Sequence, residues 1–197
     1  MDLNKWANGL NERVYNEWKT HFFEWKQGFK ILYGWPLETP RLMIISLNPG
    51  GDQSSFAEDR ERFERGDFSS AQKPPYLTSA YRFAIKMRDL FGEHVELLRE
   101  TVAFPVSFFR SEGWSSIPRN VKNQMKQFCF PIVREIIQTM PPRRLLVIGL
   151  NTYEKLESIL GGFTDKQVAL LREGEKTSTL IKESKWGAKR GAILRRI

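Results

Sequence analysis

The sequence is poor in the residues that hold metals and disulfides. It has one cysteine, Cys129, and two histidines among 197 residues. One cysteine cannot form an intramolecular disulfide, an iron–sulfur cluster or a cysteine-rich zinc site, because each of these needs further thiolates. His21 and His94 stand in no ligand spacing. We therefore expect no metal site, and a reducing, cytoplasmic location is the simplest interpretation.

Long apolar runs are also missing. No segment approaches the roughly 18 apolar residues of a membrane-spanning helix, and the N-terminus has no apolar signal core. We therefore expect no membrane partner. A chain of 197 residues with 41% apolar residues is long enough for a single domain with a buried core, which we expect to be a monomer.

Positive charge and aromatic side chains are abundant. The formal net charge is +8, and the chain has 14 Phe and 6 Trp. This charge favours nucleic acid or another polyanion as a partner. A generic basic surface explains the same charge, so both interpretations stay open.

Apolar periodicity predicts helices that alternate with short strands. The predicted helices cover residues 4–30, 78–91, 120–140 and 151–160, with a short one inside a polar loop over 48–75. The predicted strands cover residues 42–47, 101–109, 144–150, 178–183 and 191–197. Pro105 marks the second strand as an edge strand or an irregular segment.

This alternation predicts an α/β fold for the single domain over residues 1–197. We expect a three-layer α/β/α arrangement with a central, largely parallel four-stranded sheet. Residues 1–36 would form an N-terminal helical extension. Ligands in such sheets bind beyond the carboxyl ends of the strands, where Asn48 and Asn151 stand.

The abrupt end of the first buried strand is the most specific feature of the sequence. The run at 42–47 stops at Asn48-Pro49-Gly50-Gly51. Proline favours an extended Asn48, and the glycines let the backbone turn tightly and approach a ligand. Asn48 offers one acceptor and two donors to a water or a substrate amide. An ordinary turn explains the same residues, so both interpretations remain.

The sequence does not match the known phosphate-binding motifs or the nucleophile-elbow motif. The glycine spacing does not fit a dinucleotide fingerprint, and no Gly-Lys-Ser/Thr follows it as in a P-loop. The chain also lacks the G-x-S-x-G pattern of a nucleophile elbow.

Two segments in the right order resemble the uracil-DNA glycosylase superfamily. Residues 129–156 read CFPIVREIIQTMPPRRLLVIGLNTYEKL, which is similar to the superfamily's Cys-x-Pro helix and its strand ending in Leu-Gly. Residues 46–50, SLNPG, resemble the first active-site motif of its mismatch-specific and single-strand-selective branches. The resemblance spans residues 40–157 and leaves the N-terminal helix outside it.

The resemblance implies a hydrolase that acts in DNA base-excision repair. Such an enzyme flips a base, here of the uracil type, out of single- or double-stranded DNA and hydrolyses its N-glycosidic bond. It implies that Asn48 positions the attacking water. It also implies that Leu47, Pro49 and Gly50 meet the base and that Phe56 stacks on it. No cofactor or metal would be needed.

Basic residues would hold the DNA phosphates. The candidates for these contacts are Arg110, Arg119, Lys189 and Arg190. Solvated surface is the alternative for each of them.

The sequence departs from the family in two places. The family's base-reading Asn falls on or near Pro105, which has no side-chain amide. The His-Pro-Ser or Asn-Pro-Ser motif expected after the last strand is missing, and no histidine follows His94. Either the chain is truncated short of that motif, or it is a divergent member with lost or altered activity.

Two other functions fit these departures. The first is a non-catalytic member of the fold that binds nucleic acid or a nucleobase-like ligand. The second is an unrelated α/β nucleotide-binding protein whose Asn-Pro-Gly-Gly loop meets a phosphate.

Overall fold

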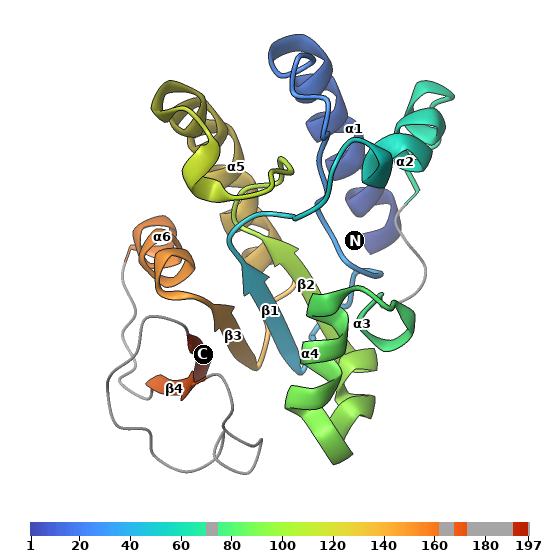
Figure 1. Cartoon of the computed structure of the whole chain (residues 1–197). Helices are drawn as coiled ribbons and strands as arrows, with labels where there is room; N and C mark the ends of the chain where they lie inside the picture. The colour runs from blue at the N-terminus through green and yellow to red at the C-terminus, as the bar shows by residue number, and fades with distance from the viewer. Residues whose placement is uncertain (70–74, 162–167, 173–190, 197) are drawn as a thin grey trace.

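A computed structural model describes residues 1–69, 75–161, 168–172 and 191–196. It has a mixed α/β fold, in which helices pack around one sheet (Figure 1). The helices are α1 Leu3–His21, α2 Ser54–Glu64, α3 Pro75–Thr78, α4 Arg82–Phe91, α5 Arg119–Thr139 and α6 Leu150–Leu160, with 3-10 helices η1 Gly92–Glu100 and η2 Trp114–Ser116.

The sheet has five strands in the order β2-β1-β3-β5-β4. The strands are β1 Leu42–Ser46, β2 Thr101–Pro105, β3 Arg144–Ile148, β4 Val168–Arg172 and β5 Gly191–Arg196. The first three run parallel to one another, whereas β5 is antiparallel to β3 and β4 is antiparallel to β5. Pro105 left an edge strand, a bulge or an irregular loop open, and β2 is an edge strand of the sheet.

The prediction of four strands is wrong. Strand β4 was missed because a run such as VALLR is too short for periodicity to distinguish strand from helix. Its pairing with β5 along the whole of its length decides its conformation. The predicted strand at 178–183 lies outside the described residues.

Both faces of the parallel strands are buried, because successive side chains of a strand point in turn into two different apolar clusters. Met43 and Ile45 of β1 belong to the larger cluster, which also holds residues of α1, α5 and α6. Leu42 and Ile44 belong to the second cluster, with residues of α3, α4 and η1. β1 therefore needs apolar residues at successive positions, and its sequence supplies them.

The first helix is shorter than predicted. Asp2 caps α1, since its carboxylate accepts the backbone N–H of Asn4 and of Lys5, each at 3.0 Å. The helix ends at His21, and the chain then turns through Gly28, whose φ is +68°. The helix-like spacing continued to Phe29 because that residue is also buried, but it reaches the core from an extended segment.

Two other predicted boundaries also need correction. The predicted helix at 78–91 begins later, because α4 starts at Arg82 and only Thr78 of the predicted range belongs to α3. The predicted helix at 151–160 begins one residue earlier, since α6 starts at Leu150, directly after Gly149. In its first turn, the Thr152 hydroxyl donates to the carbonyl of Ile148 at 2.6 Å.

None of the helices in the described part of the chain combines the length and apolar character that crossing a bilayer requires.

The aromatic core between α1, α2 and Gly28 supports a stability prediction. Phe56 is 1% exposed, whereas Phe23 is 41% exposed. We expect Phe56→Ala to lower the free energy of unfolding by about 3–5 kcal/mol, because it leaves a cavity among packed rings. Phe23→Ala is the control, and it should lower the free energy of unfolding much less. Urea unfolding measures both, and equal losses would contradict this packing.

Candidate functional site

The segment that follows β2 continues the pairing with β1 beyond the ends of both strands. The N–H of Val106 donates to the carbonyl of Ser46 at 2.8 Å. Further along, the N–H of Ser111 donates to the carbonyl of Pro49 at 3.2 Å. These bonds hold the Asn-Pro-Gly loop against residues 106–111.

The same segment is paired on its other side with the chain that follows α1. The N–H of Lys30 donates to the carbonyl of Phe108 at 2.8 Å, and the N–H of Arg110 donates to that of Gly28 at 2.9 Å. Residues 1–36 were predicted as an extension outside the family resemblance. Lys30 and Tyr33 of this segment line the site.

Asn48 is fixed in orientation by its amide nitrogen. Nδ2 donates to the hydroxyl of Ser111 at 2.9 Å and to the carbonyl of Pro49 at 3.1 Å. Its Oδ1 accepts no hydrogen bond from the residues that the structure describes. The side chain therefore keeps an acceptor for a water or a ligand, while its donors hold the loop.

A cavity of about 690 Å³ opens beside Asn48, at the carboxyl end of β1. This volume falls in the range of small-molecule sites. Its polar lining comes from the loop after β1 and the start of α2: Ser46, Asn48, Gly50, Gly51 and Ser55. Three cations complete the polar side: Lys30, Arg82 and Arg110.

Another part of the cavity lining is aromatic. It contains Tyr33, Tyr76, Tyr81 and Phe83. Tyr33 stacks on Tyr76 with ring centroids 5.9 Å apart, and Tyr76 meets Phe83 edge to face at 5.6 Å. Burial raises the pKa of Tyr33 to about 12 and also raises the pKa values of Tyr76 and Tyr81. The phenols are therefore neutral hydrogen-bond donors near pH 7.

Arg110 is an unusual cation, since its side chain is only 8% exposed. One guanidinium nitrogen donates to the carbonyl of Gly50 at 2.6 Å, while the buried Nε has no partner. No carboxylate in the described part of the chain forms an ion pair with it. A buried charge without a counterion is costly, so this arrangement favours a negatively charged ligand.

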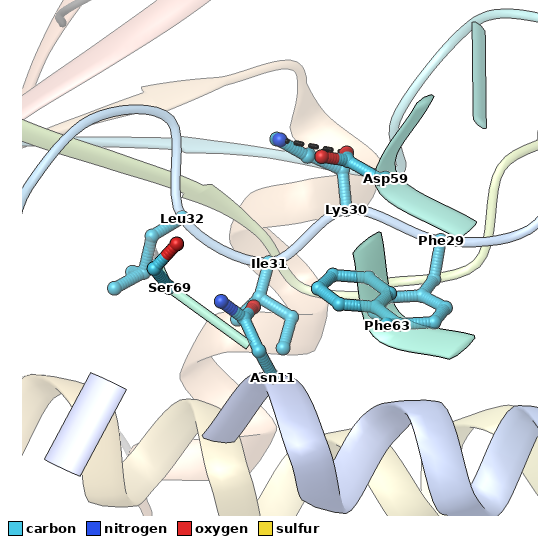
Figure 2. A pocket seen from close by; sticks show the side chains of 8 residues that line it. All are labelled: Asn11, Phe29, Lys30, Ile31, Leu32, Asp59, Phe63 and Ser69. Atoms are coloured by element: carbon cyan, nitrogen blue, oxygen red, sulfur yellow. Dashed lines mark hydrogen bonds and ion pairs between the residues drawn. The ribbon is translucent and has the colours of Figure 1, made fainter. Parts of the chain in front are cut away.

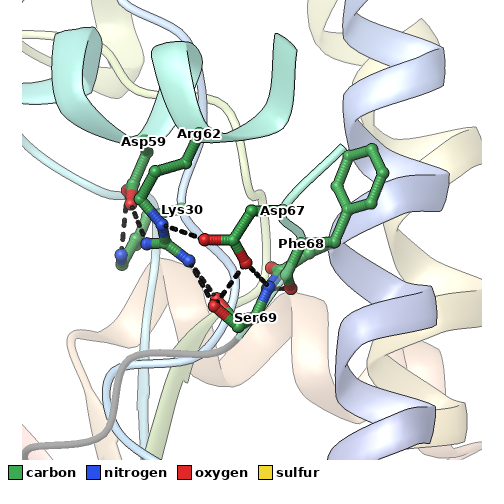
Figure 3. Close-up of polar contacts among 7 residues, drawn as sticks. Lys30, Asp59, Arg62, Asp67, Phe68 and Ser69 are labelled. Carbon is green, nitrogen blue, oxygen red and sulfur yellow. Dashed lines mark hydrogen bonds and ion pairs between the residues drawn. The ribbon is translucent and has the colours of Figure 1, made fainter. Parts of the chain in front are cut away.

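Lys30 differs from Arg110 because its charge is compensated. Its ammonium donates to Asp59 of α2 at 2.9 Å, and Arg62 reaches the same carboxylate at 3.3 Å. Figure 3 shows this network, in which Arg62 also meets Asp67 and Ser69. The network attaches α2 to the segment that carries Tyr33.

Lys30 also lines a second cavity, together with Asn11 of α1 and Asp59 and Phe63 of α2 (Figure 2). Its volume is only about 10 Å³, which is room for one water at most. Phe29 and Phe63 stack beside it, with centroids 5.5 Å apart. It is a packing gap and offers no space for a ligand.

The structure brings together some of the residues singled out in the sequence. Asn48, Gly50 and Arg110 line the large cavity. Leu47 and Pro49 belong to the same loop, where Pro49 is buried and Leu47 packs against the larger apolar cluster.

Phe56 is not available to stack on a base. It is 1% exposed, and its ring packs against Trp18 at 5.2 Å and against Phe29 at 5.1 Å between centroids. Gly28 lies so close that a Cβ there would come within 2.1 Å of the Phe56 ring. The aromatic residue that sequence reasoning placed in the site therefore belongs to the core.

The expected phosphate contacts are not gathered at one place. Arg110 is buried in the cavity, which makes it unsuited to a backbone phosphate on the surface. Arg119 is exposed at the start of α5 and does not line the cavity. Lys189 and Arg190 lie outside the described residues.

Sequence reasoning missed the tyrosines and Ser111. Tyr76 lies in α3 and Tyr81 just after it, in the segment PPYLTSAYR, and two tyrosines beside a proline pair in a polar region were a usable signal. Tyr33 and Ser111 carried no such signal, because long-range pairing alone brings them to the loop.

Gly51 is the glycine that the loop requires. Its φ is +104°, and a Cβ there would lie 2.7 Å from the Ser55 hydroxyl and 3.0 Å from the Arg110 guanidinium. Gly50 has open space around its Cβ position and no positive φ. The turn itself therefore depends on the second glycine of the pair.

This difference can be measured with two alanine variants. We expect Gly51→Ala to lower the free energy of unfolding by about 1–3 kcal/mol through backbone strain. Gly50→Ala, the matched control, should change it by less than about 0.5 kcal/mol. Chemical denaturation distinguishes the two, and a larger loss for Gly50→Ala would contradict the loop geometry.

In the part of the chain that the structure describes, His, Cys, Asp and Glu form no group of three that could hold a metal ion. Comparison of the sequence with models of known protein families and with curated proteins found no match.

Proposed function

We propose that this chain is a uracil-DNA glycosylase-like protein, with the three-layer arrangement of that family. In this proposal the large cavity takes one base flipped out of DNA, and the protein hydrolyses its N-glycosidic bond. The observation that carries the proposal is Asn48, whose amide oxygen remains an acceptor in a cavity with an aromatic wall.

The lining suits a flat, polar ring. Tyr33 and the more exposed Tyr81 offer aromatic surface, and stacking of a base on such a surface contributes about 1–3 kcal/mol. The neutral phenols can donate to carbonyl oxygens of a pyrimidine. The volume of about 690 Å³ is sufficient for a base and part of its sugar.

Asn48 would act by orienting water. A neutral amide is too weak a base to remove a proton, but Oδ1 can accept a hydrogen bond from the water and aim it at the sugar. The bond between C1′ and the base nitrogen breaks with both electrons on the base. The water oxygen bonds to C1′, and its proton reaches the base anion through solvent. The products are an abasic sugar and a neutral base.

Asn48→Ala tests this role. We expect the variant to lose base release from uracil-containing oligonucleotides while it keeps DNA affinity, because the water loses its acceptor. Asn151→Ala is the matched control, since this exposed Asn follows the neighbouring strand β3 and does not line the cavity. Alkaline cleavage at abasic sites reports release. Equal release by Asn48→Ala and the wild-type chain would remove Asn48 from the mechanism.

The net charge of +8 supports DNA as the partner and sets a salt response. We expect affinity for DNA to fall by orders of magnitude over a few-fold rise in salt, because bound phosphates release counterions. Arg119→Gln should reduce the slope of log K against log salt by about 0.7–0.9 if this exposed residue contacts one phosphate. Fluorescence anisotropy measures both. A flat response would show that the charge serves another purpose.

A second candidate function is a non-catalytic protein that binds a nucleobase-like ligand. It is favoured by the lining of the cavity, which contains neither His21 nor His94. Pro105 also pairs with Ser46 at the site and has no side-chain amide to read a base edge. If the chain binds a base but releases none in the alkaline-cleavage assay, this second function is favoured.

A further inference from the structure

We infer that Arg110 makes the cavity a receptor for a negative charge on the edge of a planar ring. In the proposed glycosylase, on which this application rests, that charge is the anion of the departing base. Arg110 would then stabilise the leaving group in a chain whose cavity contains no histidine.

The Arg110 side chain has hydrogen-bond donors that the described residues do not use. The guanidinium is held at one end, where it donates to the carbonyl of Gly50 at 2.6 Å, and its Nε is buried without a partner. Such an orphaned donor in a native structure calls for a specific explanation. Because Nε itself is inaccessible, a ligand in the cavity would reach the guanidinium through its terminal nitrogens, where a charged acceptor would make the shorter and stronger bond.

Backbone hydrogen bonds hold Arg110 rigidly. Its N–H donates to Gly28 at 2.9 Å, and its carbonyl accepts the indole N–H of Trp25. Gly51 leaves space for the guanidinium, because a Cβ there would lie 3.0 Å from it. A charge fixed before the reaction stabilises a developing anion without reorganisation.

The described charged side chains around Arg110 leave its charge without a counterion. The basic side chains on the neighbouring segments are Lys26, Lys30, Arg82 and Arg88. The acidic ones are Glu24, Asp52, Asp59 and Glu112; Asp59 pairs with Lys30 and Arg62, and in the described part of the chain none of the four forms an ion pair with Arg110. Hydrogen bonds from Ser54 and Ser55 hold the pKa of Asp52 below its ordinary value.

The tyrosines of the cavity do not interfere between pH 6 and 9. Burial raises the pKa of Tyr33 to about 12, and the pKa values of Tyr76 and Tyr81 are raised as well. A change in ligand affinity in this range therefore does not come from ionisation of these phenols.

The test is calorimetric titration of the full chain with uracil and with the more acidic 5-fluorouracil, from pH 6 to 9. We expect affinity for 5-fluorouracil to rise about tenfold or more as the ligand ionises, which is the effect of one charge-assisted hydrogen bond. Arg110→Gln should abolish the rise. Arg41→Gln removes the same charge just before β1, at the amino end of the strand, and should preserve it.

Failure of this inference can be distinguished from failure of the proposed function. If the base binds with no rise, or if Arg110→Gln keeps the rise, the inference is overturned while base binding stands. If the wild-type chain binds no base, the proposed function falls. Benzoate, a planar carboxylate, is then the probe: binding that requires Arg110 supports the anion receptor, and no binding overturns it.

A second measurement avoids the need for a folded Arg110→Gln. In ¹⁵N NMR spectra of the wild-type chain, the Nε–H resonance of Arg110 should shift when 5-fluorouracil is added at pH 9. An unchanged resonance at saturating ligand would overturn the inference.

Discussion

Backbone pairing on both sides of residues 106–111 is the constraint on which the site depends. One side of this segment holds the loop after β1, and the other side holds the chain after α1. Asn48, Arg110 and Tyr33 come from distant parts of the sequence, and this pairing brings them to one cavity. Because backbone hydrogen bonds carry much of the arrangement, the lining side chains need not supply all the contacts that hold the loop.

Two kinds of polar group meet at this cavity, and they differ in how completely they are satisfied. Lys30 and the donors of Asn48 are satisfied within the protein, so they fix the shape of the site. The Oδ1 of Asn48 accepts no hydrogen bond from the described residues, and the buried Nε of Arg110 has no partner among them. One is an acceptor and the other a charged donor, which is the combination that water-mediated departure of an anion requires.

The sequence was sufficient to predict the strands that carry the site. Runs such as LMIIS and RLLVI are buried strands because their neighbours supply apolar side chains on both faces, and the edge position of β2 is one of those that Pro105 left open. Long-range pairing explains the failures. Phe29 continues the helical spacing, although it forms a bridge to Phe109 from outside the helix. Phe56 packs with other rings in the core. Strand β4 depends on its pairing with β5. Asn48 was found because its local pattern was unusual, whereas Arg110 was named only as a basic residue for phosphate contact.

The most direct test of the account is whether a base enters the cavity with the tyrosine wall. The chain has 5 tyrosines, of which Tyr33, Tyr76 and Tyr81 line the cavity, while Tyr15 and Tyr153 lie elsewhere. In ¹⁹F NMR spectra of protein labelled with 3-fluorotyrosine, added uracil should shift the resonances of the three cavity tyrosines and leave the other two in place. Shifts confined to Tyr15 or Tyr153, or no shift at saturating uracil, would contradict the account.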